Sequence, residues 1–507
     1  MTDRRIATHA APGGLPDASA LGRRPHAVVV GAGIAGLAAA TGLAERGVTV
    51  DVVEREPYLG GRVGGWPDAL DDGTPVAMNR GFHAFFRQYY NLRKLLRRID
   101  SDLSMLTPVE DYPLVDARGR RDTFRGLPKT PPLNALVFAL RSPTFRLRDL
   151  LRINARAAAP LAAVSVPDIY AWLDHSNADD FLRDINFPVA ARHLAFEVFS
   201  RSFFAEPTDL SAAELATMFH IYFLGSSEGL VFDVADASFD VALWNPLRAY
   251  LETRDVRFHT GEAVSGVHEA SNFTVETHSG RSFEADGVVL STDVSGLQHI
   301  AEGSPTLDGD WRRRIEEIGT AAPFVVYRLW LDLPVNSDRA AFLGTGGRPP
   351  LDNVSVLERY EGQAADWARR TGGSVVELHA YAVTDGHDDL RERLLARMHE
   401  LYPETKRARI VGERVLCRND CPRFAPGDFA GRPGVGTPHD GLALAGDGIR
   451  IDLPVALMER AATTGWSAAN HLLSHFGVAG HALETVPTQG RSAGLRRLAN
   501  RGRPPGR

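Results

Sequence analysis

The chain has 507 residues, of which 44% are hydrophobic and 24% charged, a composition typical of a globular protein with two or more domains. Its formal net charge of −6 is small for this length and argues against nucleic acid as a partner. Cys417 and Cys421 are the only cysteines, which excludes a disulfide scaffold, and they lack the further ligands of a zinc site, so no metal is expected.

The two ends of the chain lack any regular spacing of apolar residues. Residues 1–24 are rich in Ala, Gly, Pro and Arg, and residues 477–507 in Gly, Pro and Arg. Such compositions predict disordered tails, the second of them basic.

A dinucleotide-binding sequence begins the ordered part of the chain. Residues 27–30 are apolar, Gly31, Gly33 and Gly36 follow with the spacing G-x-G-x-x-G, and a second apolar run stops at Glu54. This order predicts a strand, a phosphate-binding turn, a helix and a second strand. Gly31 permits the turn, Gly33 lets the backbone approach a pyrophosphate, and Gly36 allows close packing of helix and strand. Glu54 lies at the offset expected for a hydrogen bond with an adenosine ribose.

The residues after the acid distinguish between nucleotides. Arg55 follows it directly, and Gly61 and Arg62 close the same short loop. A simple NAD dehydrogenase has no need of this extension, whereas it is typical of flavin-binding two-dinucleotide-fold proteins, where the arginine adds charge near the cofactor. The sequence therefore predicts FAD.

An aromatic segment follows at residues 81–90, which read GFHAFFRQYY. Apolar residues at 92, 95, 96 and 99 then fall at helical spacing, so a helix is expected from about residue 91. This segment is too aromatic for an ordinary surface loop, and we expect it to border the flavin and the substrate.

These segments resemble a known group of enzymes. Residues 60–66, GGRVGGW, and 81–96, GFHAFFRQYYNLRKLL, are similar to the flavoprotein carotene desaturases of plants and cyanobacteria. Within that family, the sequence MNRGFHAFFRQYYNLR is most similar to the bacterial β-carotene desaturase/methylases, or isorenieratene synthases. Arg62 and Arg87 depart from the plant enzymes, which carry Lys and Gly there. The middle of the chain matches only in general character.

The middle of the chain changes pattern twice. Residues 100–245 are mostly helical in pattern, with several prolines. Residues 256–294 alternate as in strands, and Val264 is expected to contact adenine through its backbone, as in many flavoproteins of this fold. Further strands are expected at 324–331 and 374–383, and a helix from about 388 to 402.

A second sequence expected to contact the cofactor lies near the end of the chain. A short apolar strand leads to Gly446 and Asp447, the second flavin signature, and Pro454 is expected to open the next helix. Asp447 would meet the ribityl chain or a phosphate-linked hydroxyl, and the helix N-terminus would face the isoalloxazine ring. Met458 begins the M-E-x-A pattern of the desaturases.

Together these patterns predict an α/β protein with a two-dinucleotide-binding, Rossmann-like FAD fold and an inserted α+β substrate domain. We expect residues 25–90, 245–300 and 410–476 to form the FAD-binding domain, and 91–244 and 301–409 a substrate domain facing the membrane. The residues assigned to FAD are Gly31, Gly33, Gly36, Glu54, Arg55, Gly61, Arg62, Gly81, Val264, Gly446, Asp447 and Met458.

The resemblance implies an FAD-dependent oxidoreductase that desaturates a carotenoid. The implied reaction converts β-rings of β-carotene to aromatic rings with intramolecular methyl migration, since no further nucleotide fingerprint for a methyl donor is present. Phe82 and Tyr90 belong to a set of rings that would stabilise a carbocation, at about 0.5–2 kcal/mol per ring. His83, with a pKa near neutrality, is either the proton acceptor or a residue that hydrogen-bonds to nearby backbone.

Other functions stay open on this sequence. The same scaffold carries amine oxidases and other desaturases, and a flavoprotein of this kind can also act by binding, as an electron-transfer or membrane-docking subunit. The electron acceptor, quinone or oxygen, is not determined by the residues.

A hydrocarbon substrate dissolves in lipid, so we expect a cytoplasmic protein docked on the inner face of the cell membrane, without a membrane span. Residues 136–162 are the candidate docking segment. They combine apolar residues with a set of arginines, a composition that suits an anionic headgroup layer. These residues are Leu136, Val137, Phe138, Leu140, Arg141, Arg146, Arg148, Arg152 and Arg156. The alternative is a solvated helix face packed on a core.

Overall fold

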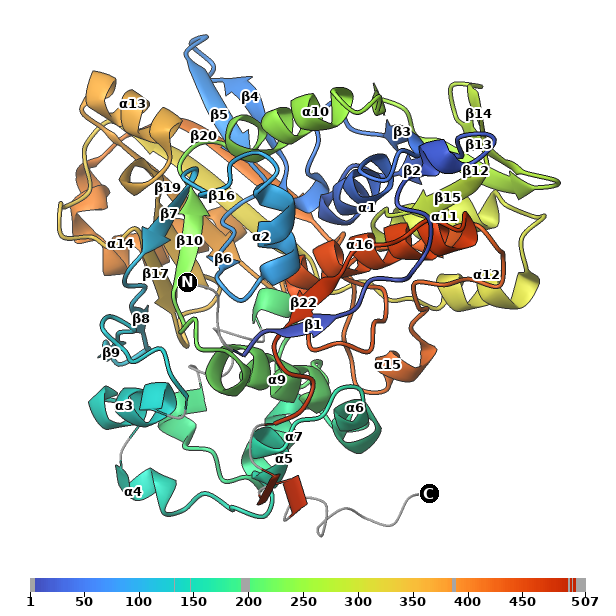
Figure 1. Ribbon diagram of the computed structural model, residues 1–507. Helices are drawn as coiled ribbons and strands as arrows, with labels where there is room; N and C mark the ends of the chain where they lie inside the picture. The colour runs from blue at the N-terminus through green and yellow to red at the C-terminus, as the bar shows by residue number, and fades with distance from the viewer. Residues whose placement is uncertain are drawn as a thin grey trace.

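The computed structural model describes residues 5–131, 133–145, 147–192, 201–384, 389–490, 493–494 and 496–497. Figure 1 shows two β-rich regions above a layer of short helices along the lower edge of the molecule. The strands of this part of the chain form six sheets, and the two largest carry the site described below.

A five-stranded parallel sheet contains the dinucleotide-binding sequence, in the order β11-β3-β2-β15-β21. Its strands are β2 (His26–Val30), β3 (Thr49–Glu54), β11 (Arg257–Thr260), β15 (Gly287–Leu290) and β21 (Leu442–Leu444). Helices α1 (Ile34–Ala44) and α16 (Leu457–His475) pack against each other beside it (Figure 1). This arrangement confirms the predicted Rossmann-like α/β fold.

Local sequence explains the first βαβ unit. Val28, Val29 and Val30 are β-branched and buried, which suits a strand in the interior of a parallel sheet. Every residue of α1 is buried, as expected for a helix that is apolar on all sides. The helix ends at Ala44, and Gly47, with a φ of 75°, turns the chain towards β3.

An antiparallel meander and two helices complete the region around the parallel sheet. The meander has the order β12-β13-β14, and α11 packs against β12. The bounds are β12 (Val264–Glu269), β13 (Phe273–Thr277), β14 (Ser282–Ala285), α11 (Val294–Glu302) and α12 (Gly309–Glu316).

A seven-stranded sheet forms the second β-rich region, in the order β20-β16-β19-β18-β17-β8-β9, with only the β17–β8 pair parallel. Its strands are β8 (Leu114–Val115), β9 (Arg121–Asp122), β16 (Phe324–Leu331), β17 (Phe342–Thr345), β18 (Asn353–Val356), β19 (Ser374–Ala380) and β20 (Ile410–Arg418). Helices α13 (Gly362–Thr371) and α14 (Leu390–Leu401) pack against it. Strands β16 and β19 and helix α14 confirm the elements predicted for residues 324–402.

Smaller elements connect the two regions. Strands β4 (Gly65–Ala69) and β5 (Pro75–Asn79) form a hairpin, and β10 (Phe232–Ala235) pairs with both β6 (Phe85–Phe86) and β7 (Leu106–Val109). Helix α2 (Tyr90–Leu96), at the predicted place, packs against α16, and α10 (Asn245–Glu252) packs against α1.

The layer at the lower edge of Figure 1 consists of short helices. They are α3 (Leu133–Arg141), α4 (Leu147–Leu150), α5 (Ala159–Ala162), α6 (Asp168–Leu173), α7 (Ala178–Asp184) and α9 (Ala212–Phe219). Strands β7 to β10 also lie within residues 100–245. The prediction of mostly helical structure there missed them, because strands of two to four residues show too few alternations to be recognised.

The chain termini differ from the predicted tails. Strand β1 (Ala7–His9) pairs with β22 (Leu483–Thr485), so the disorder predicted for residues 1–24 and 477–507 is wrong for these two strands. Residues 1–4, 491–492, 495 and 498–507 of the predicted tails lie outside the described residues. The predicted domain boundary at residue 410 is also wrong, because β20 pairs with β16 in the seven-stranded sheet. Both errors concern pairings between distant parts of the chain.

Candidate functional site

A cavity of about 510 Å³ is lined by residues of both large sheets. One part, the cofactor half, is lined by the glycine-rich turns, by the end of β3 and by the loop after β21. The other part, the aromatic half, is lined by Phe82, Phe86, Tyr112, Phe232 and Phe342. Its size is within the range of ligand and cofactor sites.

The glycines of the first motif hold the turn between β2 and α1 against its neighbours. Gly31 has a φ of 95°, and a Cβ there would lie 2.8 Å from the carbonyl oxygen of Ser291. A Cβ on Gly36 would lie 1.9 Å from the carbonyl oxygen of Gly31, so only glycine allows α1 to approach the turn. A Cβ on Gly33 would meet nothing closer than the Gly61 Cα at 4.0 Å, so Gly33 faces open space.

Glu54 lies at the end of β3, where two backbone groups fix its carboxylate. The N–H of Ala32 donates to Oε2 at 2.6 Å and the N–H of Glu56 donates to Oε1 at 2.9 Å. Burial raises the pKa of Glu54, and these hydrogen bonds to the carboxylate oppose that shift. Arg55 beside it donates to Asp293 Oδ2 at 2.7 Å. The carboxylate is thus oriented at the wall of the cofactor half.

Arg62 and Asp447, both predicted to contact FAD, form an ion pair at the wall of the cavity. Gly446 has a φ of 151°, which glycine tolerates best. Helix α16 begins at Leu457 and not at Pro454 as predicted, and Leu457 has a φ of 53°, a left-handed conformation that is costly for leucine. Leu457 and Met458 both line the cavity, so this strained helix start lies at the site.

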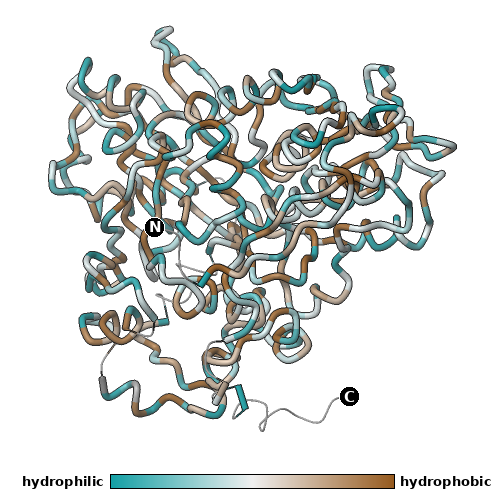
Figure 2. Tube along the Cα trace, in the orientation of Figure 1, coloured by the Kyte–Doolittle hydropathy of each residue, from teal (hydrophilic) through white to brown (hydrophobic). Residues whose placement is uncertain are grey.

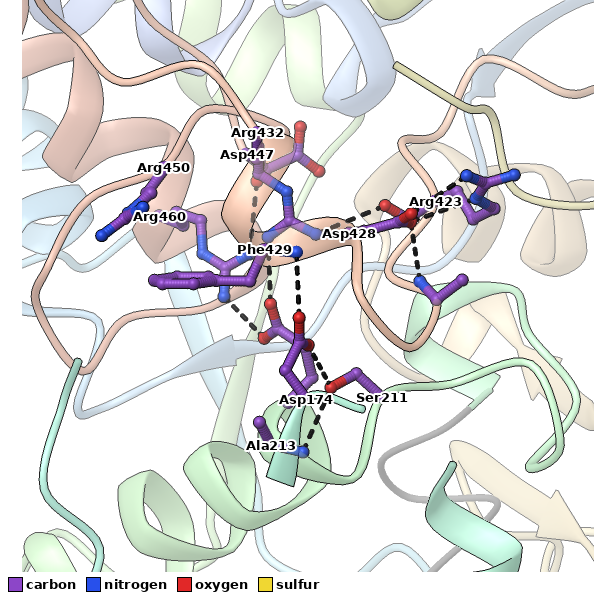
Figure 3. Close-up of polar contacts among 12 residues, drawn as sticks. Asp174, Ser211, Ala213, Arg423, Asp428, Phe429, Arg432, Asp447, Arg450 and Arg460 are labelled. Carbon is purple, nitrogen blue, oxygen red and sulfur yellow. Dashed lines mark hydrogen bonds and ion pairs between the residues drawn. The ribbon is translucent and has the colours of Figure 1, made fainter. Parts of the chain in front are cut away.

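A buried carboxylate ties the helical layer to the loop of Asp447. Glu214 of α9 accepts hydrogen bonds from Arg432 at 3.1 Å and from Arg460 at 2.7 Å. Arg460 also donates to the carbonyl oxygen of Asp447 at 3.5 Å, and Figure 3 shows these arginines near Asp447, with Asp174 approaching from the helical layer. Glu214 thus pairs with two buried guanidinium groups and holds them beside the cofactor half.

The cofactor half has the features that FAD requires. Within the described part of the chain, no side chain caps the first turn of α1, so its N–H groups are available to a pyrophosphate, and the turn is open on the side of Gly33. The residues predicted to contact FAD that line the cavity are Gly31, Gly33, Glu54, Arg55, Gly61, Arg62, Val264, Gly446, Asp447 and Met458. Of the residues predicted to contact FAD, Gly36 and Gly81 lie outside the cavity lining. Each of them allows two neighbouring segments to approach closely.

The aromatic half brings rings from several strands and loops together. The ring centroids of Phe82 and Phe342 are 4.5 Å apart, those of Phe86 and Phe232 5.4 Å, and those of Tyr112 and Phe232 4.6 Å. Such walls orient an apolar ligand by shape and by contact with ring faces.

His83 lies at the wall where the two halves meet. Its Nδ1 donates to the carbonyl oxygen of Gly81 at 2.9 Å, and burial lowers the pKa of His83 to about 4. The predicted pKa near neutrality is therefore wrong, because the prediction ignored desolvation of the imidazolium. Gly81 has a φ of 101°, and a Cβ there would lie 2.8 Å from Val326. The hydrogen bond to backbone, the second role expected for His83, agrees with this geometry.

Two residues of the aromatic segment lie elsewhere than expected. Among the described residues, Tyr90 and Phe85 are absent from the lining of the cavity. Tyr90 begins α2, with its hydroxyl 3.5 Å from Ser226 Oγ, and Phe85 is fully buried against Phe239. Phe86 and Tyr89, which belong to the same predicted set of rings, do line the cavity. Phe85 and Phe86 are consecutive residues of β6 and therefore face opposite sides of the strand.

The structure adds a polar wall that the sequence interpretation missed. Glu377, His379 and Tyr381 follow one another on one face of β19 and its extension, since side chains in a strand alternate between faces. His379 and Tyr381 line the cavity together with Asn353. The alternating sequence V-E-L-H-A-Y, with polar residues on a strand buried on both faces, is the signal that would have identified them.

The comparison with known families agrees with this geometry. The sequence model of the family described as flavin containing amine oxidoreductase matches residues 34–473. The chain belongs to this family. It is 56% identical over 501 residues to the carotenoid phi-ring synthase of Streptomyces griseus, a match that covers 98% of this chain and 96% of the relative. The zeta-carotene desaturase of Synechocystis is 25% identical, with 88% of this chain and 97% of the relative covered.

Two solved structures have a similar fold. Putrescine oxidase bound to putrescine has a TM-score of 0.63 at 15% identity, and cyclohexylamine oxidase from Brevibacterium oxydans a TM-score of 0.64 at 14% identity. Each match covers 89% of this chain and 99% of the other chain. The protein is an FAD-dependent oxidoreductase, as the sequence predicted.

Proposed function

We propose that the protein converts a β-ring of a carotenoid to an aromatic ring, with intramolecular migration of one ring methyl group. The observation that carries this proposal is the direct continuity of the cofactor half and the aromatic half in one cavity. The similarity to carotenoid phi-ring synthases supports the substrate class.

The reaction needs what the cavity supplies. Aromatisation removes hydrogens as hydride and proton pairs, and FAD, when bound, accepts the hydrides. Loss of a hydride leaves a ring carbocation, to which a methyl group on the neighbouring quaternary carbon can shift. Phe82, Phe86, Tyr112, Phe232 and Phe342 surround the space next to the cofactor half. Their ring faces stabilise such a cation by about 0.5–2 kcal/mol per ring and leave no water to quench it. A quinone or oxygen would then reoxidise the reduced cofactor.

Purified protein incubated with β-carotene in detergent, without oxygen, tests the proposal. Bleaching of the flavin absorbance together with an aromatised carotenoid in the extract is the expected result. Reduction by monoamines or diamines and not by β-carotene would instead assign the protein to the amine oxidases that share its fold. Flavin that neither substrate reduces would favour a binding role.

We further propose that α3 docks on lipid. Leu133, Leu136 and Leu140 lie on one face of α3 and are exposed, and Leu151 beyond α4 is 88% exposed. Arg141, Arg148, Arg152 and Arg156 are exposed nearby, whereas Arg146 of the predicted docking set lies outside the described residues. Figure 2 shows the hydrophobic turns of this helix at the lower edge of the molecule. Val137 and Phe138, which were also predicted to contact lipid, are half-buried.

The docking helix connects to the cavity through stacked rings. Phe138 of α3 stacks on Phe124 with centroids 5.1 Å apart, and Phe124 stacks on Tyr112 of the aromatic half at 4.3 Å. A carotenoid leaving the bilayer at α3 would therefore lie close to the aromatic half. None of the helices in the described part of the chain is long and apolar enough to cross a membrane.

Vesicle flotation tests the docking proposal. Replacing Leu136 and Leu140 by Ser should abolish flotation with anionic vesicles, and Arg148→Glu with Arg152→Glu should abolish its dependence on lipid charge. A matched control replaces Val411 and Val415, which are 46% and 44% exposed on β20. If the leucine and arginine variants float as the wild type does, the proposal that α3 docks on lipid is wrong.

A further inference from the structure

The proposed aromatisation releases protons inside a buried cavity, and the inference that follows rests on that proposed function. Each oxidation leaves a proton on the protein, so repeated turnover needs both an acceptor and a route to solvent. His83 is a weak acceptor, because burial lowers its pKa to about 4 and its Nδ1–H is engaged by Gly81.

A chain of hydrogen bonds begins at the cavity wall on β19. The hydroxyl of Tyr381 lies 2.9 Å from His379 Nδ1, and His379 Nε2 lies 2.8 Å from Glu377 Oε1. Asn353 donates to the Tyr381 hydroxyl oxygen at 3.0 Å. His379 and Glu377 are buried, whereas Tyr381 is partly exposed at the cavity.

The chemistry of the partners fixes the direction of these hydrogen bonds. The carboxylate of Glu377 only accepts, so His379 Nε2 carries a hydrogen and its Nδ1 accepts from the Tyr381 hydroxyl. Although burial opposes ionisation, Arg328 and His379 hold the pKa of Glu377 at about 2. Arg328 donates to Glu377 Oε2 from Nε at 2.8 Å, which leaves Oε1 for the histidine. The chain is therefore set to move a proton away from the cavity.

A second carboxyl group lies behind the first. Arg328 also pairs with Glu361 at 3.6 Å, and Asn79 donates to Glu361 Oε2 at 2.8 Å. A cavity of about 10 Å³, with room for about one water molecule, is lined by both Glu377 and Glu361. Burial raises the pKa of Glu361 to about 7, so this carboxyl group can take up and release a proton near neutral pH.

Glu361 connects this small cavity to the surface. It also lines a groove of about 260 Å³ between the β4–β5 hairpin and α13, together with Arg328 and the exposed Asp366. His83 and Phe82 separate the small cavity from the aromatic half, since both line the two spaces. Three adjoining spaces thus lead from the reaction cavity past Glu377 and Glu361 to solvent.

We propose that Tyr381 accepts the ring proton and that His379, Glu377 and Glu361 conduct it to the groove beside α13. The ring C–H bond breaks and its electron pair stays in the ring as a π bond. The proton binds the Tyr381 oxygen while the original hydroxyl proton passes to His379 Nδ1. The imidazolium formed gives its Nε2 proton to Glu377, and water carries it to Glu361 and out. Arg328 is a positioning residue that holds both carboxylates.

Variants that remove single donors or acceptors test the relay in the FAD-loaded protein. Tyr381→Phe should slow formation of the aromatised product about a hundredfold, and Glu361→Gln about tenfold, with FAD content and Tm unchanged. Tyr327→Phe and Glu358→Gln are matched controls, because both residues are on or beside the same sheet and neither lines these spaces. Losses of equal size in the controls, or wild-type rates in Tyr381→Phe, would overturn the relay.

Chemical rescue separates proton conduction from a structural role. Formate or azide should enter the groove and restore turnover to Glu361→Ala, but should leave the Tyr381→Phe rate unchanged. Failure of both anions to raise the Glu361→Ala rate would overturn the role of Glu361. A wild-type protein that aromatises no β-ring carotenoid would overturn the proposed function and the relay with it. An active wild type with unaffected variants would overturn the relay alone.

Discussion

The two halves of the cavity are built by different means. The cofactor half is made of backbone: Gly31 and Gly36 lie where a Cβ would collide, and the free end of α1 faces the cavity. The aromatic half is made of side chains that strands and loops from distant parts of the chain bring together. A site made of backbone keeps its ligand, whereas a site made of side chains can change its ligand while the fold stays. Putrescine oxidase has the same fold at 15% identity, as expected where the ligand depends on the side chains of the site and not on the fold.

The sharpest test of the comparison is made on two glycines of the same turn. Gly36→Val should prevent folding around the turn, because even a Cβ would lie 1.9 Å from the Gly31 carbonyl oxygen. Gly33→Val should fold and lose FAD, because its side chain would enter the open cofactor half. Flavin absorbance and thermal unfolding of the apoprotein measure the two effects. Stoichiometric flavin in Gly33→Val would contradict the assignment of this half.

The next largest effect is expected in the polar wall. Glu377→Ala leaves Arg328 buried with only the more distant Glu361, which should lower the free energy of unfolding by about 3–5 kcal/mol. Because the pKa of Glu377 is held below its ordinary 4.5, its contribution is present above that pH and is lost as the pH falls towards 2. Urea unfolding at pH 7 and pH 3 should therefore show a smaller difference between variant and wild type at pH 3.

A smaller effect is expected from a single ring of the aromatic half. Phe82→Leu should keep FAD and lower turnover about tenfold, the value of one cation–π contact of about 1.4 kcal/mol. Phe85→Leu is the control, because Phe85 is buried in the core and does not line the cavity. It should lower Tm and leave the rate per bound flavin unchanged. Equal rates in the two variants would mean that the rings only fill space.

The smallest effect is expected at His83. His83→Ala should change turnover less than about threefold, since an imidazole with a pKa of about 4 stays neutral at physiological pH. The pH–rate profile between pH 5 and 8 should coincide with that of the wild type. An inflection in the wild-type pH–rate profile that is missing from the His83→Ala profile would instead indicate that His83 is the proton acceptor.

The residues predicted to contact FAD in the first part of the chain are close together in sequence, and the structure brings them to one cavity. Gly31, Gly33, Glu54 and Arg62 belong to one βαβ unit and its loop, and all four line the cavity. Strand β16 has the bounds predicted from its apolar run. In both cases the local sequence alone determines the local structure.

The aromatic half and the termini were harder to predict. Tyr90 was expected at the cavity but lies outside its lining, because sequence spacing does not show where β6 ends and α2 begins. Strand β1 pairs with β22 from the other end of the chain, a contact that no local pattern contains. The significance of His379 depends on its neighbours Tyr381 and Glu377 in a strand that faces the cavity.

The central claim is aromatisation with an internal methyl shift, and isotope labelling tests it most directly. The purified FAD-loaded protein would receive β-carotene carrying carbon-13 in the paired methyl groups of the ring. The account predicts that the aromatic product keeps all of the label, with one labelled methyl group on the neighbouring ring carbon, seen by mass and NMR spectra. A product that has lost a labelled methyl group, or that carries an unlabelled one in its place, would contradict the account.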